Sequence, residues 1–162
     1  MLMIEPINES SILKIIGGKL LYIHDLIDLA FEIKGKFRNK ELDFSALIQP
    51  YGGSEWENLT MMIPYLPREI IEENLDQLLE GFMDLNWPGS RILYGYLAEI
   101  DIYKLKDSFD RVIDKAIGLD DTDWVYFLCI FMDDERVGMK DCFIPQIEKS
   151  RSFLKSRNID YD

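Results

Sequence analysis

Three segments of the chain repeat one pattern, in which a polar helix cap is followed by a tryptophan and then by an apolar helix. The segments are Ser54–Trp56, Leu85–Trp87 and Thr122–Trp124, so the tryptophans are 31 and 37 residues apart. Each interval also contains a second amphipathic helical pattern. Because a single helix pair cannot cover its own apolar face, such pairs must stack on one another. The spacing therefore predicts an all-α fold of stacked antiparallel helix pairs.

A helix–turn–helix unit that recurs every ~30–45 residues is typical of an α-solenoid of the HEAT kind. We expect a short, HEAT-like α-solenoid in which residues 54–157 form the helix-pair repeat core. Residues 1–50 are then either an N-terminal extension or extra helices that complete the stack. The 162 residues contain no linker long enough to separate domains, so one domain is expected. The alternative is three unrelated helix starts in an irregular helical domain.

Apolar residues recur at helical spacing along most of the chain. Before residue 19 the pattern is ambiguous: Met1–Ile4 is expected to be extended and Ser10–Ile16 to form one or two helical turns. The helices expected after that run from Lys19 to near Gly35, over Glu41–Ile48, from Ser54 to Pro64, from Pro67 to Phe82, from Pro88 to Ile100, from Lys104 to Ile117, from Trp124 to Met132, and toward Arg157 with a kink or break at Pro145.

Residues that commonly cap or open a helix stand at the predicted starts. They are the capping-box pair Ser54 and Glu57, the first-turn prolines Pro67 and Pro88, the alternative caps Asp84 and Asn86, and the aspartates Asp120, Asp121 and Asp123. Gly118 is expected to end the helix before the last of these starts. We expect Trp56, Trp87 and Trp124 in the first turns of three helices, with their rings largely buried.

Four pieces of residues 54–150 form a further pattern. They are the turn Ile63-Pro64-Tyr65-Leu66-Pro67, the pair Leu78-Leu79, the Asp84–Gly89 segment with its Asn86-Trp87-Pro88-Gly89 run, and Asp121-Thr122-Asp123-Trp124. Together they resemble a bacterial family that is classed as a domain of unknown function. The Asn-Trp-Pro-Gly run is the most specific of the four. The resemblance implies a compact HEAT-like helical domain and carries no activity, and residues 1–50 lie outside it.

The charge of the chain narrows the choice of partners. The sequence holds 30 acidic and 18 basic residues, which give a net charge of −12 at pH 7. Binding to nucleic-acid phosphates depends on Lys and Arg, so a nucleic-acid partner is not expected. Anionic membrane surfaces are repelled for the same reason, and no apolar run approaches the roughly 18 residues of a membrane span. A basic partner protein would be attracted; alternatively, the charge serves solubility alone.

The sequence shows no pattern typical of secretion, because the apolar stretch Ile12–Ile16 is interrupted by Lys14 and no basic segment precedes it. Two cysteines in a chain of this length do not make a disulfide framework. Cys129 lies in an apolar run, where it suits a helical core. A cytoplasmic location is expected.

Few residues are suited to catalysis or to metal binding. The one histidine, His24, lies beside Asp25 and has no second histidine or nearby cysteine, so a His/Cys metal site is not expected. The aspartates at 120, 121 and 123 lack the spacing, the glycine and the distant glutamate of a calcium-binding loop. The sequence has no nucleophile elbow, phosphate-binding loop or dinucleotide fingerprint. No catalytic residue, metal or cofactor is therefore expected.

Two other patterns have structural explanations. The Trp87-Pro88-Gly89 turn is interpreted as a wedge between neighbouring helices, with a recognition surface as the alternative. Acidic and basic residues alternate on one predicted helix, which indicates ion pairs along its own surface. These residues are Asp107, Asp110 and Asp114 with Lys104, Lys106, Arg111 and Lys115.

We therefore expect a protein-binding module that presents an acidic helical surface. A concrete version is an immunity-type protein that masks a basic toxin such as a nuclease. The candidate binding residues lie on one helix and at the ends of repeats: Glu69, Glu72, Glu73, Asp76, Asp120, Asp121, Asp133, Asp134 and Glu135. One alternative is an enzyme with a carboxylate-lined helical cleft, in which two acidic side chains are buried together with raised pKa values. Another is a purely structural or oligomerising domain, which an exposed apolar patch would indicate.

Overall fold

The computed structural model describes residues 21–48 and 55–161, and in these ranges the chain forms helices joined by turns and no strand. The predicted all-α fold is confirmed. Expectations for Met1–Ile4, Ser10–Ile16 and the Ser54 cap lie outside the described residues. With η denoting a 3-10 helix, the elements are α2 (Ile23–Arg38), η1 (Phe44–Leu47), α3 (Glu55–Met62), η2 (Ile63–Tyr65), α4 (Arg68–Glu73), α5 (Leu75–Leu78), η3 (Leu79–Phe82), α6 (Ser90–Leu97), α7 (Ile102–Gly118), α8 (Thr122–Asp133), η4 (Lys140–Cys142) and α9 (Ile144–Ser156).

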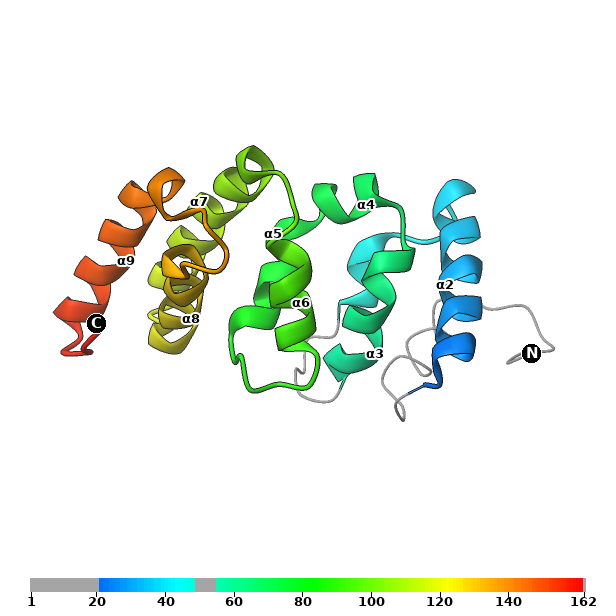
Figure 1. Cartoon of the computed structure of the whole chain (residues 1–162), viewed down its shortest axis with the longest axis horizontal. Coiled ribbons are helices and arrows are strands. Elements are labelled where there is room, and N and C mark those ends of the chain that lie inside the picture. Colours follow the sequence, from blue (N-terminus) through cyan, green and yellow to red (C-terminus); the bar gives the residue numbers. More distant parts are fainter. Residues whose placement is uncertain (1–20, 49–54, 162) are drawn as a thin grey trace.

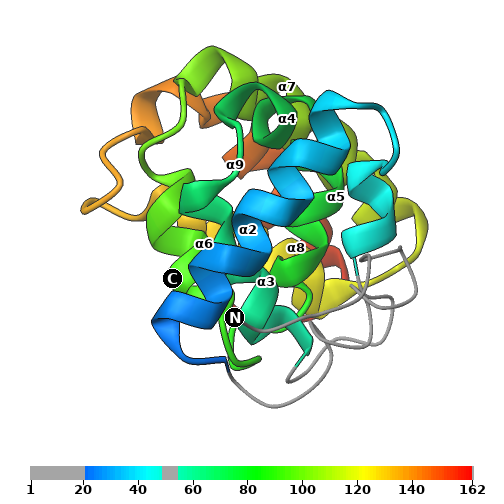
Figure 2. The same ribbon diagram turned by 90° about the vertical axis from the view of Figure 1, so that its right-hand side faces the viewer.

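The helices follow one another along the long axis of the molecule in chain order, from α2 at one end to α9 at the other (Figure 1). Seen along that axis, α2 lies in front and the later helices lie behind it (Figure 2). Helix α3 packs against α2 and α6, α5 packs against α7, and α7 packs against both α8 and α9. Each part of the chain therefore contacts elements close to it in sequence. None of the described helices is long and apolar enough to cross a membrane.

Two of the three predicted tryptophan helix starts are confirmed. Trp56 lies in the first turn of α3 and Trp124 in the first turn of α8, and their side chains are 1% and 0% exposed. The Asp121 carboxylate accepts a hydrogen bond from the Trp124 backbone N–H at 3.1 Å and so caps α8 as predicted. The Trp124 indole donates to the Leu79 carbonyl at 2.9 Å, which connects α8 to η3.

The third start was predicted wrongly. Trp87 lies in the turn before α6, not in its first turn, and its ring is half-buried against the core. The helix begins three residues later, at Ser90, because Gly89 adopts a left-handed conformation with φ of 89° that no helix contains. The Asp84 side chain forms a local turn by accepting from the Asn86 backbone N–H at 2.8 Å, so it does not cap α6.

The single helix expected from Pro67 to Phe82 is instead three short pieces, α4, α5 and η3. The break lies at Asn74, whose backbone leaves the helical conformation with φ of −122° and ψ of 23°. Its side chain donates to the Ile70 carbonyl at 2.7 Å. Asparagine side chains compete with the backbone for such hydrogen bonds, which is why asparagine is a poor residue inside a helix. The apolar periodicity alone did not reveal this break.

Three long helices, α2, α7 and α9, end in the same way, and none uses glycine to do so. The second residue after each helix has a positive φ: Lys40 at 57°, Asp120 at 54° and Asn158 at 59°. The next residue in each case donates its backbone N–H to a carbonyl five positions back, as in a Schellman motif. Helix α2 therefore continues past Gly35, where an end was expected, and α7 ends at Gly118 while Asp120 makes the turn.

Two further boundaries differ from expectation. The short helix expected over Glu41–Ile48 is the 3-10 helix η1, which begins after the Asp43 side chain accepts from the Ser45 backbone N–H. Pro145 does not kink the last helix; it lies in the first turn of α9, where the missing N–H of proline has no cost.

Large rings fill the core between α6, α7 and α8. Phe109 and Phe131 stack with ring centroids 5.3 Å apart, and Phe82 and Phe143 contact this pair. All four rings are fully buried. Cys129 is also fully buried, as predicted, and burial raises the pKa of its thiol to about 11, so the thiol is protonated at neutral pH.

Polar contacts between helices recur at a sequence separation of 35 to 37 residues. They join α5 and η3 to α7, and they join α7 and the turn after it to α9 and the residue that follows α9. The alternating charges of α7 were expected to pair along that helix, but the described pairs cross to neighbouring helices. They are Asp76–Arg111, Glu80–Lys115, Asp110–Gln146, Asp114–Lys149 and Asp120–Arg157.

Candidate functional site

Six of the nine acidic residues predicted to bind a partner already serve the fold. Asp121 caps α8, and the other five form ion pairs with cationic side chains within the chain. These pairs are Glu72 with Arg68, Asp76 with Arg111, Asp120 with Arg157, Asp133 with Lys140 and Arg151, and Asp134 with Arg136. The structure therefore does not bring the nine residues together into one surface.

Ion pairing lowers the pKa of three of these aspartates. Burial raises the pKa of Asp76, but the hydrogen bonds from Arg111 and Ser108 and the charges of Arg111 and Lys115 together outweigh it, so the pKa is lowered. Burial also raises the pKa of Asp133, but the ion pairs with Lys140 and Arg151 together outweigh burial. The pKa of Asp133 is therefore lowered as well. These carboxylates are held as anions, which is the opposite of what an acid catalyst requires.

Asp134 forms the densest polar cluster. Its carboxylate accepts from the Arg136 guanidinium at 2.7 Å, from the Arg136 backbone N–H at 2.8 Å and from the Tyr94 hydroxyl at 2.6 Å. The Arg136 bond is the main reason that the pKa of Asp134 lies well below its usual range. Burial and the neighbouring Asp134 raise the pKa of Tyr94, so its hydroxyl stays a hydrogen-bond donor.

The three remaining candidates, Glu69, Glu73 and Glu135, have exposed side chains. Glu69 and Glu73 are four residues apart on α4 and therefore share one face of that helix. The sequence around them is strongly acidic, because residues 41–101 contain 12 of the 30 acidic residues but only two of the 18 basic ones, Arg68 and Arg91. This segment thus carries −10 of the net charge of −12.

A cleft of about 310 Å³ opens beside Glu73, between the end of α2, the η1 segment and α4. We call it the acidic cleft. Its charged side chains are Lys40, Asp43 and Glu73, and its apolar lining comes from Phe37, Leu42, Phe44 and Ile70. Asp43 was not among the predicted binding residues, since its part in the cleft depends on η1 and α4 facing the same space.

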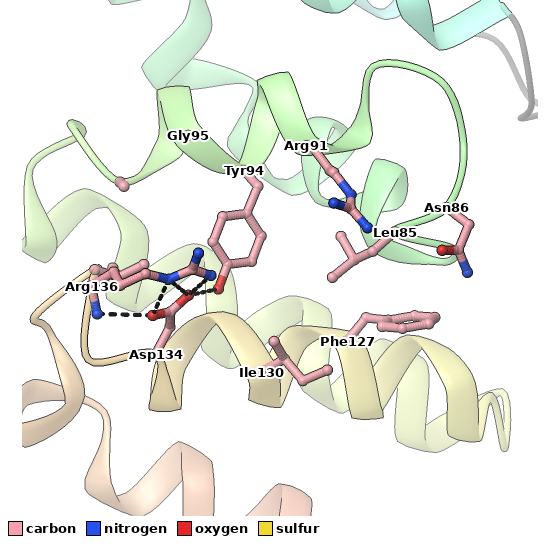
Figure 3. Close-up of a pocket in the computed structure, with 11 residues that line it drawn as sticks. Leu85, Asn86, Arg91, Tyr94, Gly95, Phe127, Ile130, Asp134 and Arg136 are labelled. Atoms are coloured by element: carbon pink, nitrogen blue, oxygen red, sulfur yellow. Dashed lines mark hydrogen bonds and ion pairs between the residues drawn. The ribbon is translucent and has the colours of Figure 1, made fainter.

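A second and larger hollow, of about 610 Å³, lies between α6 and α8, and we call it the α6–α8 groove (Figure 3). Tyr94, Asp134 and Arg136 close one end, while Asn86 lies at the other end (Figure 3). The apolar lining consists of Leu85, Ala98, Phe127, Ile130 and Val137. Gly95 keeps the wall of α6 open, because a Cβ atom built there meets no atom within 4 Å.

Sequence reasoning missed the α6–α8 groove, although one signal was present. Gly95 stands in the middle of an apolar helical pattern, where glycine costs about 1 kcal/mol relative to alanine. Such a glycine often has a packing or functional reason. The contribution of Asp134 to the groove wall was not predictable, because its partner Tyr94 lies 40 residues away.

The described part of the chain has few side chains that are placed for catalysis or for metal binding. No group of three or more His, Cys, Asp and Glu side chains is placed there to hold a metal ion. His24 is exposed and lies 3.5 Å from the Asp25 carboxylate. Cys129 and Cys142 are both free, one buried and one exposed.

Comparison with known proteins adds no relative. No family model, no curated protein and no solved structure matches this chain. The resemblance of residues 54–150 to a bacterial family of unknown function stays a prediction.

Proposed function

We propose that the chain is a protein-binding module that attracts a basic partner protein through the acidic surface around α4. In its most specific form, this is an immunity-type protein that masks a basic toxin in the cytoplasm. The observation that carries the proposal is the distribution of charge: residues 41–101 hold −10 of the net charge of −12. A field of one sign over one part of a surface speeds association with an oppositely charged partner.

The scaffold that we propose is a short, HEAT-like stack of helix pairs. The regular separation of 35 to 37 residues between polar partners on α5 and η3, α7 and α9 supports it, because equivalent helices of successive repeats would meet at that interval. Stacked helix pairs present an extended surface, and repeat proteins commonly use such surfaces for binding other proteins.

The ion pairs of the described residues leave two glutamates of α4 uncompensated. Arg68, one of the two basic residues in the segment 41–101, donates to Glu72 and to the Glu99 carbonyl, while Glu69 and Glu73 stay exposed on α4. Among the cations elsewhere in the described ranges, Lys36 pairs with Glu41, Arg111 with Asp76 and Lys115 with Glu80, but none pairs with Glu69 or Glu73. The exposed glutamates of α4 are therefore the natural first contacts for a basic partner.

The acidic cleft supplies a recognition site for one lysine or arginine of that partner. Long basic side chains lay their apolar stems along apolar surface and keep the charged head in water. Here Phe37, Phe44 and Ile70 would contact the stem, and Asp43 and Glu73 would receive the head. Lys40 at the rim moderates the attraction but leaves the charged lining with a net charge of −1.

A binding role agrees better with the described carboxylates than the alternative of an enzyme. An acid catalyst needs a carboxyl group with a raised pKa, usually produced by burial beside a second carboxylate. Asp76, Asp133 and Asp134, the described carboxyl groups with displaced pKa values, are all displaced downward.

The test compares two double charge reversals with a fluorescein-labelled oligolysine peptide as the probe. Glu69→Lys/Glu73→Lys alters the proposed surface, and Asp141→Lys/Glu148→Lys alters exposed residues of the C-terminal part. Both change the net charge by the same amount. Because each exposed ion pair contributes up to ~1 kcal/mol, we expect the first variant to weaken binding roughly tenfold and the second about twofold.

Fluorescence anisotropy at roughly 0.05 and 0.3 M salt measures the effect, since salt screens exposed charges over about a Debye length. Circular dichroism confirms that both variants stay folded. If the two double variants weaken binding equally, only the total charge matters, and the proposed surface is wrong.

A further inference from the structure

We propose that the α6–α8 groove binds a small ligand that combines an apolar body with one carboxylate. This inference is independent of the proposed protein-binding surface, which lies around α4. It rests on three features of the groove: its apolar lining, an arginine without an anionic partner, and a rigid polar end.

The lining suits an apolar ring or a branched chain. Leu85, Phe127, Ile130 and Val137 are half-buried and present apolar surface to the groove. Leu85 and Val137 also pack against the core. The volume of about 610 Å³ falls in the range of roughly 300–1,000 Å³ that is usual for small-molecule sites. The missing side chain at Gly95 adds to the space, as described above.

The charge of the groove lining is opposite in sign to the net charge of the chain. Its charged side chains are Arg91, Asp134 and Arg136, which gives the lining a net charge of +1. Asp134 and Arg136 neutralise each other through three bonds between their side chains. Arg91 is exposed, reaches into the space between α6 and α8, and forms no ion pair with any residue of the described ranges (Figure 3).

An unpaired guanidinium beside apolar surface favours a carboxylate. Its planar fork of N–H donors matches the two oxygens of that group, and such charge-assisted pairs are stronger than neutral hydrogen bonds. In a segment with two basic residues, Arg91 is the one left available, since Arg68 is occupied by Glu72 and Glu99. The groove therefore offers an available cation to an anionic ligand in an otherwise acidic part of the chain.

The far end of the groove is held in place before a ligand arrives. The Tyr94 ring contacts Phe82 and Phe131 with centroids 5.7 and 4.9 Å away, and its hydroxyl donates to Asp134. A wall fixed on both sides loses little conformational freedom on binding, which favours affinity. The polar end also leaves no unpaired anion to repel the ligand.

The experiment titrates ¹⁵N-labelled protein with 1-naphthylacetate and, separately, with its neutral amide, 1-naphthylacetamide. The two probes share the ring system and differ in the carboxylate. We expect the acid to bind about tenfold more tightly than the amide, the size of one partly exposed charge-assisted pair. Shifts should concentrate on the amides of Tyr94, Gly95 and Ile130, while Gly35 and Gly118 stay unmoved.

Two variants and a control separate charge from space. Arg91→Gln should bring the acid down to the affinity of the amide, and Gly95→Trp should remove binding of both probes by filling the groove. Lys104→Gln, which removes an exposed cation of α7, should leave the preference for the acid intact.

Three results would overturn the proposal: equal binding of acid and amide to the unaltered protein, no binding of either, or shifts centred away from the groove. Retention of the tenfold preference in Arg91→Gln would also overturn it. Because the mapping and the acid–amide ratio use the unaltered chain, the conclusion does not depend on whether Gly95→Trp folds. Glu69→Lys/Glu73→Lys should leave the ratio unchanged, which keeps the outcome distinct from that of the acidic surface.

Discussion

Replacing Gly89 by alanine tests how α6 is seated on α3. Gly89 immediately precedes α6 and has φ of 89°, a left-handed conformation that favours glycine. A Cβ atom there would lie 2.3 Å from Thr60 Oγ1, 2.8 Å from Glu57 Cα and 2.9 Å from the Trp56 carbonyl oxygen. Two of these atoms belong to the backbone of α3, so the whole helix would have to move to make room.

The expected loss of stability has two sources. A residue with a Cβ in the left-handed region costs ~1–2 kcal/mol. Forcing an extra carbon into a packed contact costs a further ~1–3 kcal/mol. We therefore expect Gly89→Ala to lower the free energy of unfolding by about 4 kcal/mol, a large part of the ~5–15 kcal/mol that stabilises a typical domain. For a chain of this length that corresponds to a fall of roughly 10 °C in the midpoint of thermal unfolding.

Urea unfolding followed by tryptophan fluorescence measures the change, because Trp56 lies at the contact and is fully buried. Gly95→Ala is the matched control: it lies inside α6 with open space around it and should stabilise the chain by up to ~1 kcal/mol. Gly89→Asn separates the two sources, since asparagine tolerates a positive φ but still carries a Cβ. The reasoning would be refuted if Gly89→Ala cost less than about 1 kcal/mol, or if Gly89→Asn restored full stability.

Two further predictions concern α8 and the residue that follows it. Asp121→Ala removes the cap on the Trp124 backbone N–H and should cost about 1 kcal/mol in urea unfolding, whereas Asp123→Ala, which removes an exposed charge from the same turn, should cost less. Equal losses would mean that the aspartates act through the helix dipole alone. Because folding lowers the pKa of Asp134 below its ordinary value of 3.8, the stability that it contributes is complete above that pH and is lost as the pH falls through the folded-state value. Urea unfolding between pH 5 and pH 2.5 should therefore show a steeper loss for the unaltered chain than for Asp134→Asn, and parallel curves would contradict the assignment.

Sequence predicted those parts of the fold that depend on neighbouring residues. The start of α8 is an example, because Asp121 and Trp124 are three residues apart and the capping bond joins them directly. Trp87 shows the opposite case. Its segment resembles the other starts, but Gly89 takes a left-handed turn to fit against α3, about 30 residues earlier in the chain. A contact between residues so far apart in the sequence cannot be read from the local pattern of residues around Trp87.

The candidate site was less predictable than the fold for the same reason. The sequence shows an excess of acids but does not show which of them are neutralised. Asp76 and Asp120 were expected to face a partner, and each is paired instead with an arginine 35 or 37 residues further on. Glu69 and Glu73 stay exposed and form no ion pair with the described cations, and that is a property of packing.

The shared ends of α2, α7 and α9 have a consequence for protein engineering. Lys40, Asp120 and Asn158 each hold a conformation that costs a residue with a side chain ~1 kcal/mol relative to glycine. Replacing these residues by glycine at the three exposed positions should therefore raise the stability of the chain. Asn158 is the cleanest place for this replacement, since Asp120 also bonds to Arg157 and Lys40 lines the acidic cleft. Such substitutions would make the scaffold more stable, so that it tolerates new residues in the α6–α8 groove, and they change no core side chain.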